Sequence, residues 1–191
     1  MKKQSSVKFI IILLAISLLL SCKSTEANAK NNEIVNTAIK LAEAKCSLGQ
    51  FEEAQKIYED ALNHTVDYRL IYNWAITYAK LKDFNSAISL MQQGFDLYPD
   101  HTEFLTAKIA YREIIEDTKG LLNSYEKYLE LKPEDNNLKV KYMELCLKDN
   151  DYTKAYRIAL DLWLNHYYTK NVVETLYKMD PQQWEVVNKV L

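Results

Sequence analysis

The residues that could support acid–base or metal chemistry are spread thinly along the sequence. The three histidines, His64, His101 and His166, are far apart, and none belongs to an HExxH motif or another pair with metal-ligand spacing. Paired acids such as Glu52-Glu53 fall where helix ends or exposed helix faces are expected. We therefore predict that the chain has no catalytic residues, no metal site and no cofactor.

Cys22 is the one residue whose neighbours predict a definite chemical modification. It follows Leu19-Leu20-Ser21 at the end of an apolar run over residues 9–20, and three lysines precede that run: Lys2, Lys3 and Lys8. A run of this length is too short for a membrane-spanning helix, which takes about 20 residues. It is typical of a secretory signal.

The four residues Leu19-Leu20-Ser21-Cys22 resemble the lipobox of bacterial lipoproteins. The resemblance implies that residues 1–21 are a signal peptide and that Cys22 carries a diacylglyceryl group and a further acyl chain such as palmitate. Two or more acyl chains hold a protein stably on a membrane, where one does not. An ordinary cleaved signal and an uncleaved anchor remain open as alternatives.

This N-terminus predicts a lipid-anchored, extracytoplasmic protein at the cell membrane or the outer membrane. Lys23 favours the outer membrane, because in enteric-type sorting an aspartate after the cysteine retains a lipoprotein in the inner membrane. Residues 22–33 are small and polar, which predicts a lipidated cysteine followed by a flexible tether. Removing residues 1–21 takes away three lysines, so the formal charge falls from −2 to −5. An acidic chain of this kind is not expected to bind nucleic acid.

The rest of the sequence is predicted to be all-α. Only three glycines and three prolines occur in 191 residues, whereas sandwiches and barrels need such residues at their turns. The hydrophobic content of 48% excludes a disordered chain. A helical protein is the fold class that remains.

An aromatic-x-x-alanine pattern recurs along this helical part. It begins at Phe51, Phe84 and Tyr152, and Thr118 starts a degenerate copy in register, so the steps are 33, 34 and 34 residues. A 34-residue period of paired helices resembles the tetratricopeptide repeat. The resemblance implies a right-handed α-solenoid of about four helix pairs with C-terminal capping helices. Small residues would let helices approach, and large ones such as Phe51 and Tyr152 would fill the space between them.

The period divides residues 34–191 into repeats and a cap. The repeats are predicted at about 34–67, 68–101, 102–135 and 136–167, with the cap at 168–191. Asp83 and Asp151 are predicted to cap second helices. Cys46 and Cys146 lie three repeats apart, and each step is roughly 8–10 Å, so we predict buried thiols rather than a disulfide.

The sequence offers two candidate binding surfaces. First helices line the groove of this fold, and the register places four residues of the second repeat there: Arg69, Tyr72, Asn73 and Ile76. Tyrosine and asparagine suit peptide binding, because a ring offers contact area and an amide both donates and accepts hydrogen bonds. The second surface is one face of the last predicted helix: Trp184, Val187 and Leu191. A generic solvated groove, and packing of the last helix on the fourth repeat, are the competing interpretations.

We therefore expect a non-catalytic scaffold or adaptor that holds a protein or peptide partner at a membrane of the bacterial cell envelope. A periplasmic accessory protein for small-ligand binding or transport is the alternative, and it would need a closed cavity in place of an open groove. An enzyme would need titratable groups gathered in one cleft. The sequence assigns no oligomeric state.

Overall fold

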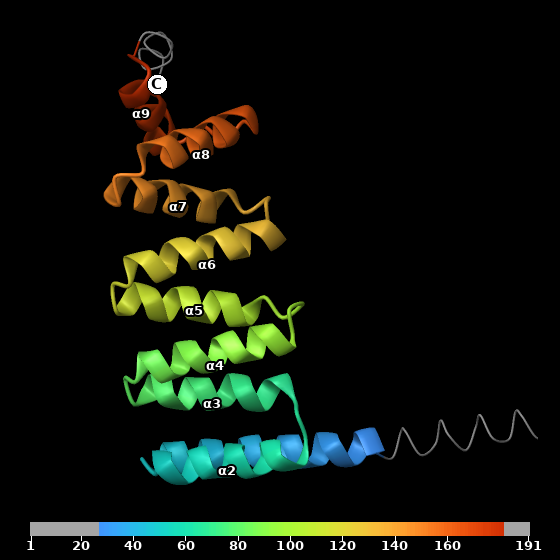
Figure 1. Ribbon diagram of the computed structural model, residues 1–191. Helices are drawn as coiled ribbons and strands as arrows, with labels where there is room; N and C mark the ends of the chain where they lie inside the picture. The colour runs from blue at the N-terminus through green and yellow to red at the C-terminus, as the bar shows by residue number, and fades with distance from the viewer. Residues whose placement is uncertain (1–26, 182–191) are drawn as a thin grey trace, which may run out of the picture. The chain divides into compact units, whose positions relative to one another are not determined.

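The computed structural model describes residues 27–181, which form helices joined by short turns (Figure 1). The all-α prediction is confirmed for this part of the chain. A first helix over residues 27–47 precedes eight labelled helices: α2 (Phe51–His64), α3 (Tyr68–Lys80), α4 (Phe84–Leu97), α5 (Glu103–Ile114), α6 (Thr118–Leu131), α7 (Asn136–Lys148), α8 (Tyr152–Leu164) and α9 (Lys170–Met179).

The second helix of each pair begins at the position that the repeat predicts. These helices start at Phe51, Phe84, Thr118 and Tyr152, so the degenerate third repeat is in register with the others. Four aspartates precede second or first helices and accept a hydrogen bond from the backbone N–H three residues on, at 2.9–3.1 Å: Asp83, Asp117, Asp135 and Asp151. Such caps satisfy backbone donors that a helix start leaves unpaired.

The chain divides into two compact units, residues 1–77 and 78–191, and the boundary falls within α3. In the first unit, small residues allow close packing of the first helix on α2: Ala42 and Ala54 are fully buried, and Tyr58 is 1% exposed. In the second unit the helices pack in chain order, from α4 on α5 to α8 on α9. Met143 and Cys146 of α7 lie in its core with Leu162 of α8.

The structure differs from the sequence-based expectation at two places. Residues 27–33, predicted as part of the flexible tether, belong to the first helix, because Ala27, Ala29, Lys30 and Glu33 are good helix formers as well as small or polar. Tyr152, predicted to fill core space, is 49% exposed, and its hydroxyl donates to Asn150 Oδ1 at 3.0 Å in the turn before α8.

Some predicted features lie outside the described residues. They are the signal peptide, the lipidation site Cys22 and the patch of Trp184, Val187 and Leu191. Among the helices of residues 27–181, none is both long and apolar enough to cross a membrane. Cys46 and Cys146 are both free thiols, the first half-buried and the second fully buried.

Candidate functional site

The four predicted groove residues lie together on one face of α3. Arg69, Tyr72, Asn73 and Ile76 are spaced at i, i+3, i+4 and i+7, which places them on adjoining turns of the same side. All four are half-buried. The opposite side of α3 is apolar and packs inward, with Leu70 and Ala75 fully buried. The face is therefore accessible, but it is partly enclosed by its neighbours.

Arg69 forms hydrogen bonds with the first helix, which lies beside α3. Its Nη2 donates to Asn32 Oδ1 at 2.7 Å and its Nη1 to Asn36 Oδ1 at 3.3 Å, and both asparagines belong to the first helix. The same guanidinium binds both carboxylate oxygens of Asp67, and this hydrogen bonding raises the pKa of Arg69. A planar guanidinium that is hydrogen-bonded along both edges has a fixed orientation as well as a fixed position of its charge. Arg69 thus connects α3 to the first helix.

The remaining residues of this face divide into one polar and two apolar groups. Asn73 Nδ2 donates to the Arg69 carbonyl oxygen at 2.8 Å, so its own helix uses one end of the amide. Tyr72 and Ile76 supply the partly exposed apolar area. On the first helix, Ile39 is half-buried as well. We call the surface of Asn36, Ile39, Tyr72, Asn73 and Ile76 the α3 face.

The first helices of the second unit border a separate hollow that sequence reasoning missed. Its volume is about 380 Å³, and it is open to solvent between α5, α6 and α7. Tyr125 donates to Glu113 Oε1 at 2.9 Å, and Lys141 Nζ lies 3.3 Å from the same oxygen. Burial and the charge of Glu113 raise the pKa of Tyr125. Glu113 lies at the end of α5 and Lys141 in the middle of α7, and neither position stands out in the sequence.

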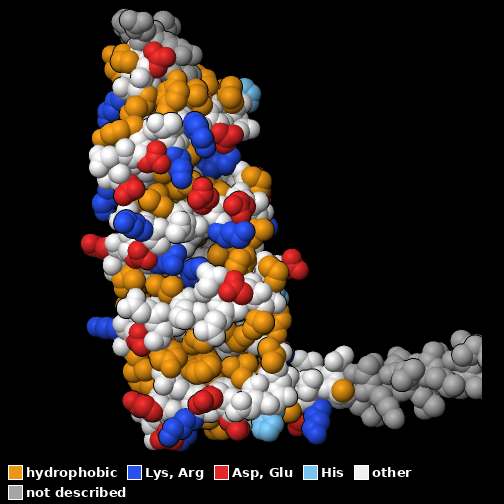
Figure 2. All heavy atoms as spheres, viewed as in Figure 1, with side chains coloured by type: hydrophobic (Ala, Val, Ile, Leu, Met, Phe, Trp, Pro, Cys, Tyr) orange, Lys and Arg blue, Asp and Glu red, His pale blue; other side chains and the backbone are white. Residues whose placement is uncertain are grey.

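The 34-residue period places four residues of the second unit at positions equivalent to those of the α3 groove residues. Thr106, Ala110 and Glu144 are exposed and Val140 is half-buried, and of these Glu144 lines the hollow. Glu144 accepts a hydrogen bond from Asn171 of α9. Lys and Arg side chains alternate with Asp and Glu over the face seen in Figure 2, without a broad area of one sign. A surface of mixed charge suits polar contacts with a protein. The face seen in Figure 2 has no basic stripe of the kind that binds nucleic acid.

Residues that could do covalent or metal chemistry do not converge in the described part of the chain. Within residues 27–181 no group of three or more His, Cys, Asp or Glu side chains is placed to hold a metal ion. His64 is exposed, 3.9 Å from Asp60, and His101 Nδ1 lies 2.6 Å from Glu103 Oε1. Burial raises the pKa of Cys146 to about 11, which leaves little of the reactive thiolate at neutral pH.

Comparison with solved structures identifies the fold. No model of a protein family and no curated protein matches the sequence. Among solved structures, a tetratricopeptide repeat protein from Parabacteroides merdae ATCC 43184 is 14% identical with a TM-score of 0.57, over 78% of this chain and 61% of that one. A chain of the Naa15/Naa10 complex bound to HypK-THB is 20% identical with a TM-score of 0.62, over 71% of this chain and 21% of that one.

A third similar structure is that of PilW. PilW, described as a type IV pilus biogenesis factor, is 14% identical with a TM-score of 0.52, over 74% of this chain and 67% of that one. Identities this low define the fold alone. The chain is an all-α tetratricopeptide repeat solenoid, as the 34-residue period predicts.

Proposed function

We propose that the protein is a membrane-anchored lipoprotein that acts as a non-catalytic protein-binding scaffold in the bacterial cell envelope. In this proposal the lipid on Cys22 holds the chain at the membrane, and the α3 face binds a segment of a partner protein. The observation that carries the proposal is the placement of Tyr72 and Ile76 on a face whose backbone Arg69 fixes to the first helix.

The chemistry of the α3 face supports a protein ligand. A partly exposed tyrosine beside an isoleucine offers apolar area to an incoming side chain, and tyrosine is enriched among residues that dominate binding energy. Because Arg69 already orders α3 against the first helix, binding costs less conformational entropy than it would on a mobile surface. The amide oxygen of Asn73 is an acceptor suited to a backbone N–H.

The similar structures support the same class of function. One of them is described in a complex bound to HypK-THB, and another as a pilus biogenesis factor. The hollow between α5, α6 and α7 is open to solvent, which favours a scaffold over the small-ligand accessory that a closed cavity would indicate.

The membrane part of the proposal rests on Leu19-Leu20-Ser21-Cys22 and is tested separately. Mass spectrometry of the protein from its native membranes should find an N-terminal peptide that starts at Cys22 and carries acyl chains. Cys22→Ser should remove that modification and release the mature chain from the lipid. An unmodified N-terminus downstream of Cys22 would contradict the lipid anchor without affecting the α3 face.

The binding part is tested by crosslinking and affinity capture from whole membranes. We expect Tyr72→Ala combined with Asn73→Ala to lose a protein that the wild-type chain captures. Tyr152→Ala is the matched control, because Tyr152 is 49% exposed on α8, a second helix. If the captured proteins are unchanged in the double variant, the α3 face is not the site and the Trp184 surface becomes the next candidate.

A further inference from the structure

The first helix pair exposes a face that the equivalent helices of the third and fourth pairs bury. Leu41, Lys108 and Tyr142 occupy the same position of the first helix in three repeats, separated by 67 and 34 residues. Lys108 and Tyr142 are 5% and 6% exposed, because α4 covers one and α6 covers the other. Leu41 is 49% exposed, and no other helix described in its unit covers it.

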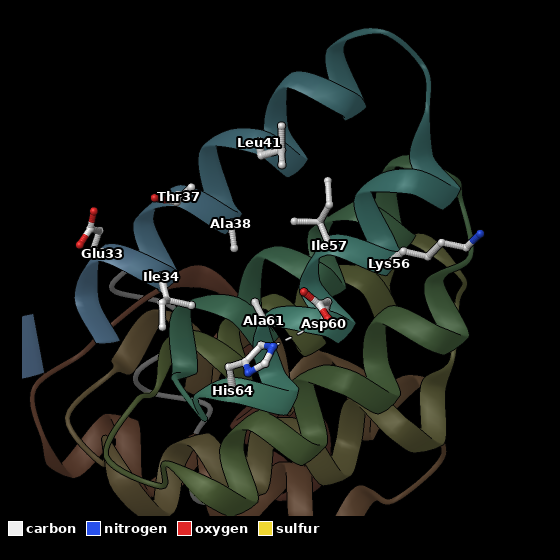
Figure 3. A pocket seen from close by; sticks show the side chains of 10 residues that line it. All are labelled: Glu33, Ile34, Thr37, Ala38, Leu41, Lys56, Ile57, Asp60, Ala61 and His64. Carbon is white, nitrogen blue, oxygen red and sulfur yellow. Dashed lines mark ion pairs between the residues drawn. The ribbon is translucent and has the colours of Figure 1, made fainter. Parts of the chain in front are cut away.

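This face forms an open apolar hollow of about 520 Å³ between the first helix and α2 (Figure 3). Its floor and walls are aliphatic or small, and they come from both helices: Ile34, Ala38, Leu41, Ile57 and Ala61. The other five lining residues are polar or charged, namely Glu33, Thr37, Lys56, Asp60 and His64, and Asp60 lies 3.9 Å from His64 (Figure 3). In the third and fourth pairs a helix, α4 or α6, fills the equivalent space, so the shape that fits this hollow is another helix surface.

The charges and apolar groups of this face are complementary to those of the same face on a second copy of the chain. On α2, Lys56 and Asp60 are one helical turn apart along the hollow. If α2 packs antiparallel against α2 of another copy, Lys56 of each copy meets Asp60 of the other. Ile34 and Leu41 lie two turns apart on the first helix and line the same hollow, so an antiparallel pairing of the two first helices would bring Ile34 of each copy opposite Leu41 of the other.

We propose that this face binds the same face of a second copy of the chain, giving a two-fold symmetric dimer. Isologous contacts of this kind use one self-complementary patch on both subunits. The apolar floor supplies the association energy, and the two Lys56–Asp60 contacts set the antiparallel orientation. The dimer leaves the α3 face unused, so it is independent of the proposed function.

Charge exchange at these two positions tests the dimer in the full-length chain. The protein is studied by sedimentation velocity in mild detergent, with micelles in large molar excess over protein so that chance co-occupancy is rare. We expect the wild type to dimerise, and Lys56→Glu and Asp60→Lys each to raise the dimer Kd by roughly tenfold or more. When the two variants are mixed in equal amounts, a heterodimer should form. The introduced glutamate of one variant then faces the introduced lysine of the other, and the second contact keeps the native Lys56–Asp60 pair.

Leu41→Lys tests the apolar part of the contact. It should abolish the dimer, whereas Leu48→Lys, at a leucine 73% exposed outside the hollow, should have no effect. Circular dichroism of each variant checks that the helices remain folded. A wild type that stays monomeric at all concentrations would overturn the proposal, and so would single variants that dimerise normally or a mixture without heterodimer. If the wild type stays monomeric and crosslinking in membranes attaches it to a protein of a different mass that Leu41→Lys no longer captures, the face serves another partner and the self-association is refuted.

Discussion

Arg69 holds the carboxylate of Asp67 through two hydrogen bonds, from Nε to Oδ1 at 2.9 Å and from Nη2 to Oδ2 at 2.8 Å. Asp67 Oδ1 also accepts the backbone N–H of Arg69 at 2.9 Å, just where α3 begins. Because the guanidinium reaches Asn32 and Asn36 as well, this pair sets the position of α3 on the first helix. The orientation of Tyr72 and Ile76 depends on it.

Replacing Arg69 should therefore weaken the fold of the first unit. We expect Arg69→Ala to lower the free energy of unfolding by about 1–2 kcal/mol, because hydrogen bonds between charged groups are lost from a half-buried site. Arg69→Lys should recover less than half of that loss, since an ammonium cannot make the two parallel bonds. Urea unfolding followed by circular dichroism measures both variants, and equal stability of wild type and Arg69→Ala would contradict this account.

Gly94 of α4 allows Phe104 of α5 to lie against the helix backbone. A methyl group on Gly94 would come within 2.7 Å of Phe104 Cδ1 and closer still to two other ring carbons, and Phe104 is fully buried. Gly94→Ala should thus destabilise the protein by about 1–3 kcal/mol, although alanine is the better helix former.

A second substitution separates the clash from a general effect of the change. Phe104→Leu removes the ring carbons concerned, so adding Gly94→Ala to Phe104→Leu should cost less than it costs the wild type. The comparison is a double-mutant cycle measured by urea unfolding. Additive losses would show that the ring does not set the size limit at position 94.

Lys108 occupies a core position that is apolar in the equivalent first and fourth repeats. It is 5% exposed, and its ammonium donates to Gln92 of α4, which in turn donates to Asp96 at 2.6 Å. Burying a cation costs free energy even when it is hydrogen-bonded. Lys108→Met should therefore raise the free energy of unfolding by about 1 kcal/mol at neutral pH. A loss of stability of that size would show that the buried hydrogen bond outweighs the desolvation.

The pH dependence provides an independent check on Lys108. Burial, helped by the charge of Arg112 and opposed by Asp96, lowers the pKa of Lys108 below its ordinary value of 10.5. Between the folded and unfolded pKa values the folded chain binds fewer protons, so this group makes stability rise with pH. Burial raises the pKa of Tyr58 to about 12, so this group makes stability fall with pH, and it does so equally in the wild type and in Lys108→Met. The stability advantage of Lys108→Met over wild type should hence shrink as the pH approaches 10.5.

The repeat could be predicted from sequence because its signals are local. Small residues at Ala54, Ala87 and Ala155 are fully buried where the period places them, and the second helices begin where it predicts. In a repeat fold each repeat contacts its neighbours in the same way, so a period of 34 residues is enough to predict the packing.

The partners of individual polar side chains could not be predicted in the same way. Arg69 reaches residues 33 and 37 positions earlier in the chain, and Lys108 reaches across to α4. Such contacts depend on side-chain length and on the angle between helices, which a periodic pattern does not specify. The exposure of Leu41 likewise follows from which helices cover it, and its residue type gives no indication of this.

Photo-crosslinking from the α3 face tests the central claim most directly. A photoreactive amino acid is placed at Tyr72 or, as a control, at Tyr152, and cells carrying the full-length chain are irradiated. We predict a protein adduct of defined mass at position 72 that is absent at position 152 and is lost when Ile76→Asp is added. The same adducts at both positions, or none at position 72, would contradict a protein-binding role for this face.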